Sequence, residues 1–116
     1  MMSVAPAQLD DWLVQAAAKA VPGGRPVVLD VREPWELQTA SVRPDGFELV
    51  HMPMRSVPAR LHELDRHQPI ACLCHHGARS AQVVHFLMQN GFSEVVNIAG
   101  GINAWSQQRD PTVPLY

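Results

Sequence analysis

A strand–loop–helix segment in the second half of the chain constrains the fold more than any other stretch. The apolar run at residues 69–73 predicts a short buried strand, and the loop that follows carries Cys74 and Gly77. Apolar residues then recur at helical spacing over residues 81–88, which predicts a helix that begins near Ser80. Because Ser is a preferred N-cap residue, we expect Ser80 to cap this helix, which should end near residues 90–91.

The predicted position of Cys74 is between the end of a strand and the start of a helix. Backbone N–H groups are unpaired there and the helix dipole is positive, so the environment favours a thiolate and also binds anions. Arg79 adds a planar fork of hydrogen-bond donors that suits an oxyanion. The segment therefore predicts a cysteine nucleophile that acts on a small anionic substrate.

Length and composition predict one soluble domain over residues 1–116, with its core at about residues 22–109. Hydrophobic residues make up 47% of the chain and charged residues 17%, with a net charge of −2. No basic cluster predicts contact with nucleic acid or an anionic membrane, and no apolar run is long enough to span a bilayer. Asp10 and Asp11 interrupt the region where a signal peptide needs apolar residues, so we expect a cytoplasmic location.

Strands and helices are predicted to alternate along the chain. A continuous apolar run predicts a further buried strand at residues 27–31, and short strands are also predicted at residues 47–52 and 95–98. Helices are predicted at residues 6–20, 32–37, 57–65 and 102–108, with a turn at 22–24, Pro34 and Pro58 in first turns, and Ser56 as an N-cap. This alternation is typical of an α/β fold, a small, mainly parallel sheet flanked by helices on both faces. Sites in such sheets lie at the carboxyl ends of the strands, where Cys74 falls.

Four segments, in this order along the chain, resemble the rhodanese family. Residues 74–80, Cys-His-His-Gly-Ala-Arg-Ser, are similar to the active-site loop of the family, Cys-x-x-Gly-x-Arg-Ser/Thr. Residues 29–36 resemble the first signature of the family and residues 90–105 its C-terminal signature, while the tail 110–116 recurs in single-domain members. The joint pattern is highly specific. It implies a rhodanese-like fold and a sulfurtransferase whose cysteine carries a sulfane sulfur as a persulfide.

The resemblance implies a role for each residue of this loop. Cys74 would attack the outer sulfur of a small anionic donor such as thiosulfate, and cyanide or a thiol, including a protein thiol, would accept the sulfur. Arg79, the second catalytic candidate, would orient the oxyanion of the donor. The backbone N–H groups of residues 75–80 would surround the persulfide, with His75 and His76 at the pocket mouth. The substrate-binding candidates are His75, His76, Gly77, Ala78 and Ser80, and no metal or organic cofactor is expected.

Two other classes of protein stay open. A phosphatase or arsenate reductase of the related fold also uses a cysteine loop and an arginine, but it has five residues between them. This chain has four, from His75 to Ala78, which favours a single sulfur atom over a tetrahedral oxyanion. The other alternative is a persulfide carrier or interaction module that is loaded by a partner and has no turnover of its own.

The remaining chemistry-bearing residues are predicted to be structural. Cys72 is expected to pack in the core rather than act as a resolving thiol, and Asp30 with Arg32 is expected to form an ion pair. A metal site built from the cysteines and histidines is not expected, because they crowd on one short loop. The loop 39–46 is expected to border the pocket, and the tryptophans Trp12, Trp35 and Trp105 are expected to pack in the core or on helices.

Overall fold

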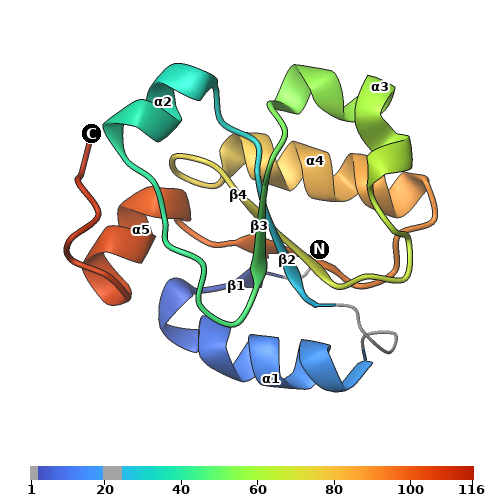
Figure 1. Ribbon diagram of the computed structural model, residues 1–116, viewed down its shortest axis with the longest axis horizontal. Helices are drawn as coiled ribbons and strands as arrows, with labels where there is room; N and C mark the ends of the chain where they lie inside the picture. The colour runs from blue at the N-terminus through green and yellow to red at the C-terminus, as the bar shows by residue number, and fades with distance from the viewer. Residues whose placement is uncertain (1–2, 20–24) are drawn as a thin grey trace.

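The computed structural model describes residues 3–19 and 25–116, and it places them in an α/β fold (Figure 1). One parallel sheet holds five strands in the order β1-β5-β4-β2-β3. The strands are β1 (Ser3–Val4), β2 (Val27–Asp30), β3 (Glu48–His51), β4 (Ile70–Leu73) and β5 (Val95–Ile98). The predicted fold class is confirmed. β1 was not predicted, because two residues are too short to show a periodicity.

The helices follow the strands along the chain. They are α1 (Leu9–Lys19), α2 (Pro34–Thr39), α3 (Val57–Arg60), α4 (Ala78–Gln89) and α5 (Gly101–Gln108). Short 3-10 turns precede α1 (Pro6–Gln8), precede α3 (Met54–Ser56) and follow α3 (Leu61–Glu63). The helix predicted over 57–65 is therefore split, because Leu64 N–H bonds to Leu61 O in the tighter i to i+3 pattern. Ala20 and the turn predicted at 22–24 lie outside the described residues.

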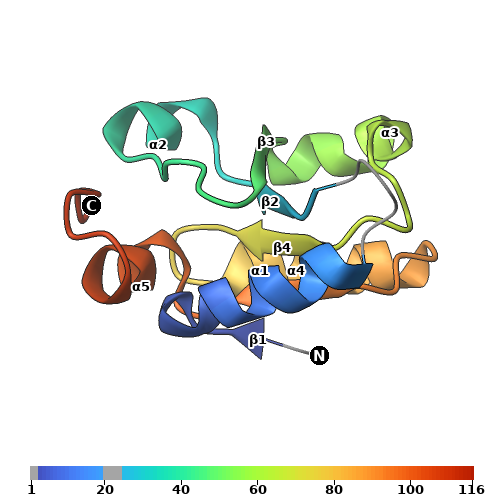
Figure 2. The same ribbon diagram turned by 60° about the horizontal axis from the view of Figure 1, so that its bottom comes forward.

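Each face of the sheet carries its own hydrophobic cluster, because successive side chains of a strand point to opposite faces. On one face, α1 and α5 pack Leu9, Leu13, Ile102 and Trp105 against strand residues such as Val28 and Leu73. On the other face, α3 and α4 pack Val57, Val83, Val84 and Leu87 against strand residues such as Val27, Leu29 and Cys72. Figure 2 shows α1 in front of the sheet and α4 behind it. With both faces covered, the carboxyl edge of the sheet is left to form a site.

The predicted N-cap of α4 is wrong, whereas Ser56 is the N-cap residue of α3, as predicted. α4 begins at Ala78, with Gly77 as the N-cap in a left-handed conformation (φ 108°), so Ser80 lies inside the first turn. Glycine adopts this conformation without a steric penalty, which lets the helix begin earlier than Ser80. The hydroxyl of Ser56 makes no capping bond and instead donates to Pro53 O at 2.7 Å.

The tryptophans differ in burial. Trp105 is buried in the core and Trp12 packs at its margin, as predicted. The prediction for Trp35 is wrong, because its side chain is 60% exposed. It lies on the short α2, and the aromatic contact that it makes is an edge-on one with Tyr116. None of the described helices is both long and apolar enough to cross a membrane.

Candidate active site

The sulfur of Cys74 lies at the base of the loop between β4 and α4. Cys74 directly follows β4, the central strand of the sheet, and the residue is 2% exposed. The N–H of Gly77 donates to Cys74 Sγ at 3.0 Å, and the hydroxyl of Ser80 lies 3.2 Å from the same atom. The fold thus brings three of the predicted site residues together around one buried sulfur atom.

The N-terminus of α5 binds the outer side of this loop. Ile102 N–H donates to Cys74 O at 2.8 Å, and Asn103 N–H donates to His75 O at 3.2 Å. This close approach of α5 to the loop requires glycine at position 101, since a Cβ there would lie 2.5 Å from Cys74 O and 2.4 Å from His75 O. In a trans peptide the C=O and the next N–H point in opposite directions. The N–H groups of His75 and His76 therefore point away from α5.

Asn97 on β5 connects Gly77 in the middle of the loop to Ser80 in the first turn of α4. Its Oδ1 accepts a hydrogen bond from Ser80 Oγ at 2.5 Å, and its Nδ2 donates to Gly77 O at 3.1 Å. Sequence reasoning did not include Asn97 in the site. The signal was present as a polar residue within the buried strand Val95–Ile98, because buried polar side chains need hydrogen-bond partners.

Arg79 is bound by a carboxylate from a distant part of the chain. Its two terminal nitrogens each lie 2.7 Å from an oxygen of Glu36, which is on α2 and is 3% exposed. Hydrogen bonding by Arg79 lowers the pKa of the Glu36 carboxyl to about 2, against the opposing effect of burial. The ion pair joins α2 to the start of α4. Contact between Arg79 and a donor oxyanion stays a prediction, because both terminal nitrogens already bind Glu36.

Two aromatic contacts enclose the ring of His75. His76 and Tyr116 each stack on it with centroids 3.9 Å apart, so one ring covers each face. Burial, and next the proximity of His76, lower the pKa of His75, so its ring is neutral over a wider pH range than that of a free histidine. Of the other predicted loop residues, His76 and Ala78 are exposed to solvent.

Cys72, Asp30 and Arg32 are buried, in agreement with the structural roles predicted for them. Cys72 is buried in the core, and burial raises the pKa of its thiol. Arg32 and Asp30 form a buried ion pair with a distance of 2.7 Å between Nη2 and Oδ2. Within residues 3–19 and 25–116, no three His, Cys, Asp or Glu side chains are grouped so as to hold a metal ion.

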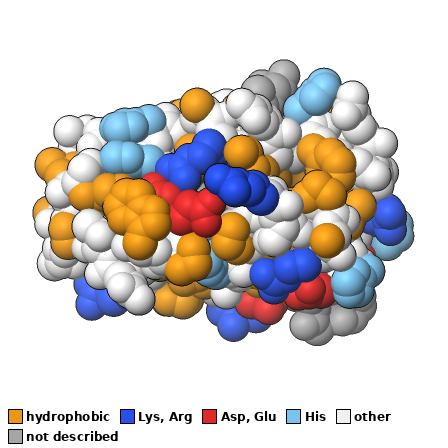
Figure 3. Space-filling model, turned by 90° about the horizontal axis from the view of Figure 1, so that it is seen from above, with side chains coloured by type: hydrophobic (Ala, Val, Ile, Leu, Met, Phe, Trp, Pro, Cys, Tyr) orange, Lys and Arg blue, Asp and Glu red, His pale blue; other side chains and the backbone are white. Residues whose placement is uncertain are grey.

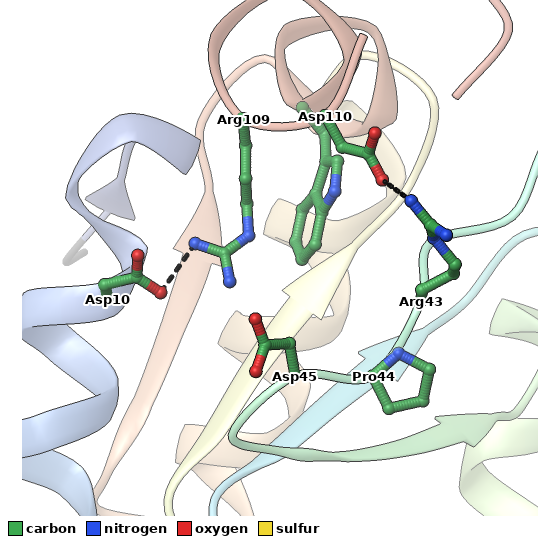
Figure 4. A pocket seen from close by; sticks show the side chains of 7 residues that line it. Asp10, Arg43, Pro44, Asp45, Arg109 and Asp110 are labelled. Atoms are coloured by element: carbon green, nitrogen blue, oxygen red, sulfur yellow. Dashed lines mark hydrogen bonds and ion pairs between the residues drawn. The ribbon is translucent and has the colours of Figure 1, made fainter. Parts of the chain in front are cut away.

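The surface above the carboxyl ends of the strands is mixed in charge. Figure 3 shows Lys or Arg side chains beside acidic ones on this face, with histidines and hydrophobic side chains next to them. A hollow of about 470 Å³ lies elsewhere, between the start of α1, the loop after α2 and the end of α5 (Figure 4). Arg43, Pro44 and Asp45 line that hollow together with Asp10, Arg109 and Asp110, and no residue of the loop 74–80 does.

Fold and site together define an α/β domain with a buried cysteine in the loop that follows the central strand. The sequence matches the family model of the rhodanese-like domain over residues 12–108, and the chain therefore belongs to the rhodanese family.

Individual relatives agree with this membership. The chain is 36% identical over 87 residues to a protein named sulfurtransferase from Allochromatium vinosum, covering 75% of this chain and 78% of that protein. It is 39% identical over 93 residues to the chloroplastic rhodanese-like/PpiC domain-containing protein 12 of Arabidopsis thaliana, covering 77% of this chain but 30% of that longer protein. The crystal structure of a rhodanese-related protein from Thermoplasma volcanium superimposes over the full length of both chains, with a TM-score of 0.76 and 32% identity. These relatives support sulfur transfer in general.

Proposed function

We propose that this chain transfers a sulfane sulfur from a thiosulfate-like donor to a thiol or cyanide through a persulfide on Cys74. The observation that carries the proposal is the hydrogen bond that Gly77 N–H donates at 3.0 Å to the buried Cys74 Sγ. The Ser80 hydroxyl, whose proton goes to Asn97 Oδ1, lies 3.2 Å from the same sulfur. A backbone N–H donor stabilises negative charge on sulfur, both in the thiolate and in a persulfide. Arg79 lies at the start of α4 in the same loop, with its charge paired by the Glu36 carboxylate.

The reaction divides into two nucleophilic substitutions. The Cys74 thiolate attacks the outer sulfur of the donor, a new S–S bond forms, and sulfite leaves with the electron pair of the broken S–S bond. The acceptor thiolate or cyanide then attacks the outer sulfur of the persulfide, and Cys74 departs as a thiolate. Neither step needs a redox cofactor, because each leaving group takes the electron pair of the bond that breaks.

The dimensions of the loop favour sulfur chemistry over phosphate chemistry. Four residues separate Cys74 from Arg79, and the carbonyls of Cys74 and His75 are fixed by α5, so the loop cannot widen easily. A tetrahedral oxyanion would need space for its oxygens around the sulfur, whereas a persulfide adds one atom.

Paired cysteine variants test the assignment. Cys74→Ser is expected to abolish thiocyanate formation from thiosulfate and cyanide, because a hydroxyl cannot carry the sulfur. Cys72→Ala is the matched control, two residues away on the same face, and should retain most of the activity because Cys72 only packs in the core. Circular dichroism would establish that both variants are folded. Substantial thiocyanate production by folded Cys74→Ser would contradict the proposal.

A further inference from the structure

The phenol of Tyr116 joins two buried charged residues behind the active-site loop. Its oxygen lies 3.0 Å from Arg32 Nη1 and 2.9 Å from Glu36 Oε1. Burial, as the largest cause, raises the pKa of Tyr116, so the phenol is protonated at neutral pH. It therefore accepts a hydrogen bond from Arg32 and donates its own to Glu36.

That second bond acts on the carboxylate that holds Arg79. Glu36 Oε1 accepts from both Tyr116 and Arg79 Nη2, at 2.9 and 2.7 Å. A hydrogen bond to a charged acceptor is strong and directional, so the phenol fixes the rotation of the carboxylate. The orientation of the carboxylate in turn sets where Arg79 holds the start of α4.

The ring of Tyr116 contacts the same loop at its other end. It stacks on His75 with the planes 3° apart and centroids separated by 3.9 Å. Because His75 directly follows Cys74, Tyr116 reaches both ends of the loop: His75 by its ring, and Arg79 through Glu36. No hydrogen bond or ring contact of Tyr116 involves Cys74 itself in the part of the chain that the structure describes.

The segment before Tyr116 is packed against the domain. Val113 is buried in the cluster under α5, and its carbonyl accepts a hydrogen bond from Ser106 Oγ at 2.5 Å. Asp110 is bound by Arg43 and by Thr112. Figure 1 shows the end of this segment beside α2. The segment that places Tyr116 beside the loop is therefore held against the domain by contacts of its own.

We propose that Tyr116 is a positioning residue for sulfur transfer, which holds the loop 74–80 closed around the sulfur through Glu36–Arg79 and through His75. This role rests on the function proposed above for Cys74. It predicts that the hydroxyl and the ring contribute separately, because they act on opposite ends of the loop.

Three variants separate these contributions. Tyr116→Phe keeps the ring and removes the hydroxyl, Tyr116→Ala removes both, and Leu115→Ala is the control at a neighbouring side chain that is 58% exposed. The assay is kcat/KM for sulfur transfer from thiosulfate to cyanide, at a temperature where urea unfolding establishes that every variant is folded. The second readout is the proton NMR resonance of His75 Hε1, which the currents of its two stacked rings shift upfield.

The expected results are distinct for each variant. Tyr116→Phe should lower kcat/KM about fivefold, because Glu36 loses one charge-assisted bond, while the His75 resonance stays upfield. Tyr116→Ala should lower kcat/KM further and move the His75 resonance downfield. Leu115→Ala should change neither quantity.

Two results would overturn the role of Tyr116. Wild-type kcat/KM in Tyr116→Phe would exclude positioning by the hydroxyl, and an unchanged His75 resonance in Tyr116→Ala would exclude the stacking contact. Failure of the proposed function is distinguishable from failure of the role of Tyr116, because the wild-type protein itself would then transfer no sulfur.

Discussion

The electrostatics of the candidate site depend on the carboxylate group of Glu36. It accepts hydrogen bonds from both terminal nitrogens of Arg79, from Glu33 N–H at 2.9 Å and from the Tyr116 hydroxyl. Four donors use the whole accepting capacity of a carboxylate. A buried charge is tolerated at this position because it is fully paired.

This pairing predicts a dependence of stability on acid. The pKa of Glu36 is about 2 in the folded chain, against an ordinary value of 4.5. The carboxylate therefore stabilises the fold fully above pH 4.5, and the contribution, on the order of 3 kcal/mol, is lost as the pH falls from 4.5 towards 2. Urea unfolding at a series of pH values measures it.

Glu36→Gln supplies the comparison for that measurement. This variant should be less stable than wild type at pH 7, because Arg79 loses its counter-charge. Its free energy of unfolding should fall less steeply than that of wild type between pH 4.5 and 2. Parallel curves for the two proteins in that interval would show that Glu36 is not the responsible group.

At the scale of elements, α5 packs closely on the loop 74–80. Gly101 has φ 60°, and its Cα lies where a side chain would collide with the backbone of the loop. Gly101→Ala should lower the free energy of unfolding by about 3 kcal/mol or more, because both the left-handed conformation and the clash oppose it. Sulfur transfer should fall as well, since the carbonyls of Cys74 and His75 would be displaced.

Gly46→Ala is the matched control for this prediction. Gly46 has φ 82°, but the nearest atom to its added Cβ is 3.8 Å away, on the flexible end of Leu13. Gly46→Ala should lower the free energy of unfolding by only about 1 kcal/mol, because of the backbone conformation, and should leave sulfur transfer intact. Equal losses of stability in the two variants would mean that the contact between α5 and the loop is not tight.

The pattern of elements could largely be predicted from the sequence, because it depends on local periodicity. Strand 95–98 was predicted with its observed bounds, and the β4–loop–α4 segment in its correct order. The pairs of residues that bind each other within the site could not be predicted from the sequence. Glu36 lies 43 residues from Arg79, and Tyr116 lies 80 residues from Glu36. Such pairs form only once the sheet order is known, and a local pattern does not give that order.

For the whole molecule, that sheet order explains why the site forms at the loop after β4. β5 and β2 flank β4 in the sheet, so α5 and α2, which follow these strands, lie on the two sides of the loop. α5 supplies N–H donors to the carbonyls of the loop, and α2 supplies Glu36 to Arg79. The central strand places the cysteine, and its neighbours hold the loop around it.

Intact-protein mass spectrometry tests most directly whether Cys74 carries the transferred sulfur. Protein incubated with thiosulfate and then freed of it should gain the mass of one sulfur atom. Peptide mapping should place that sulfur on Cys74, and cyanide or a small thiol should remove it. No gain in mass, or a sulfur found on Cys72, would contradict the account.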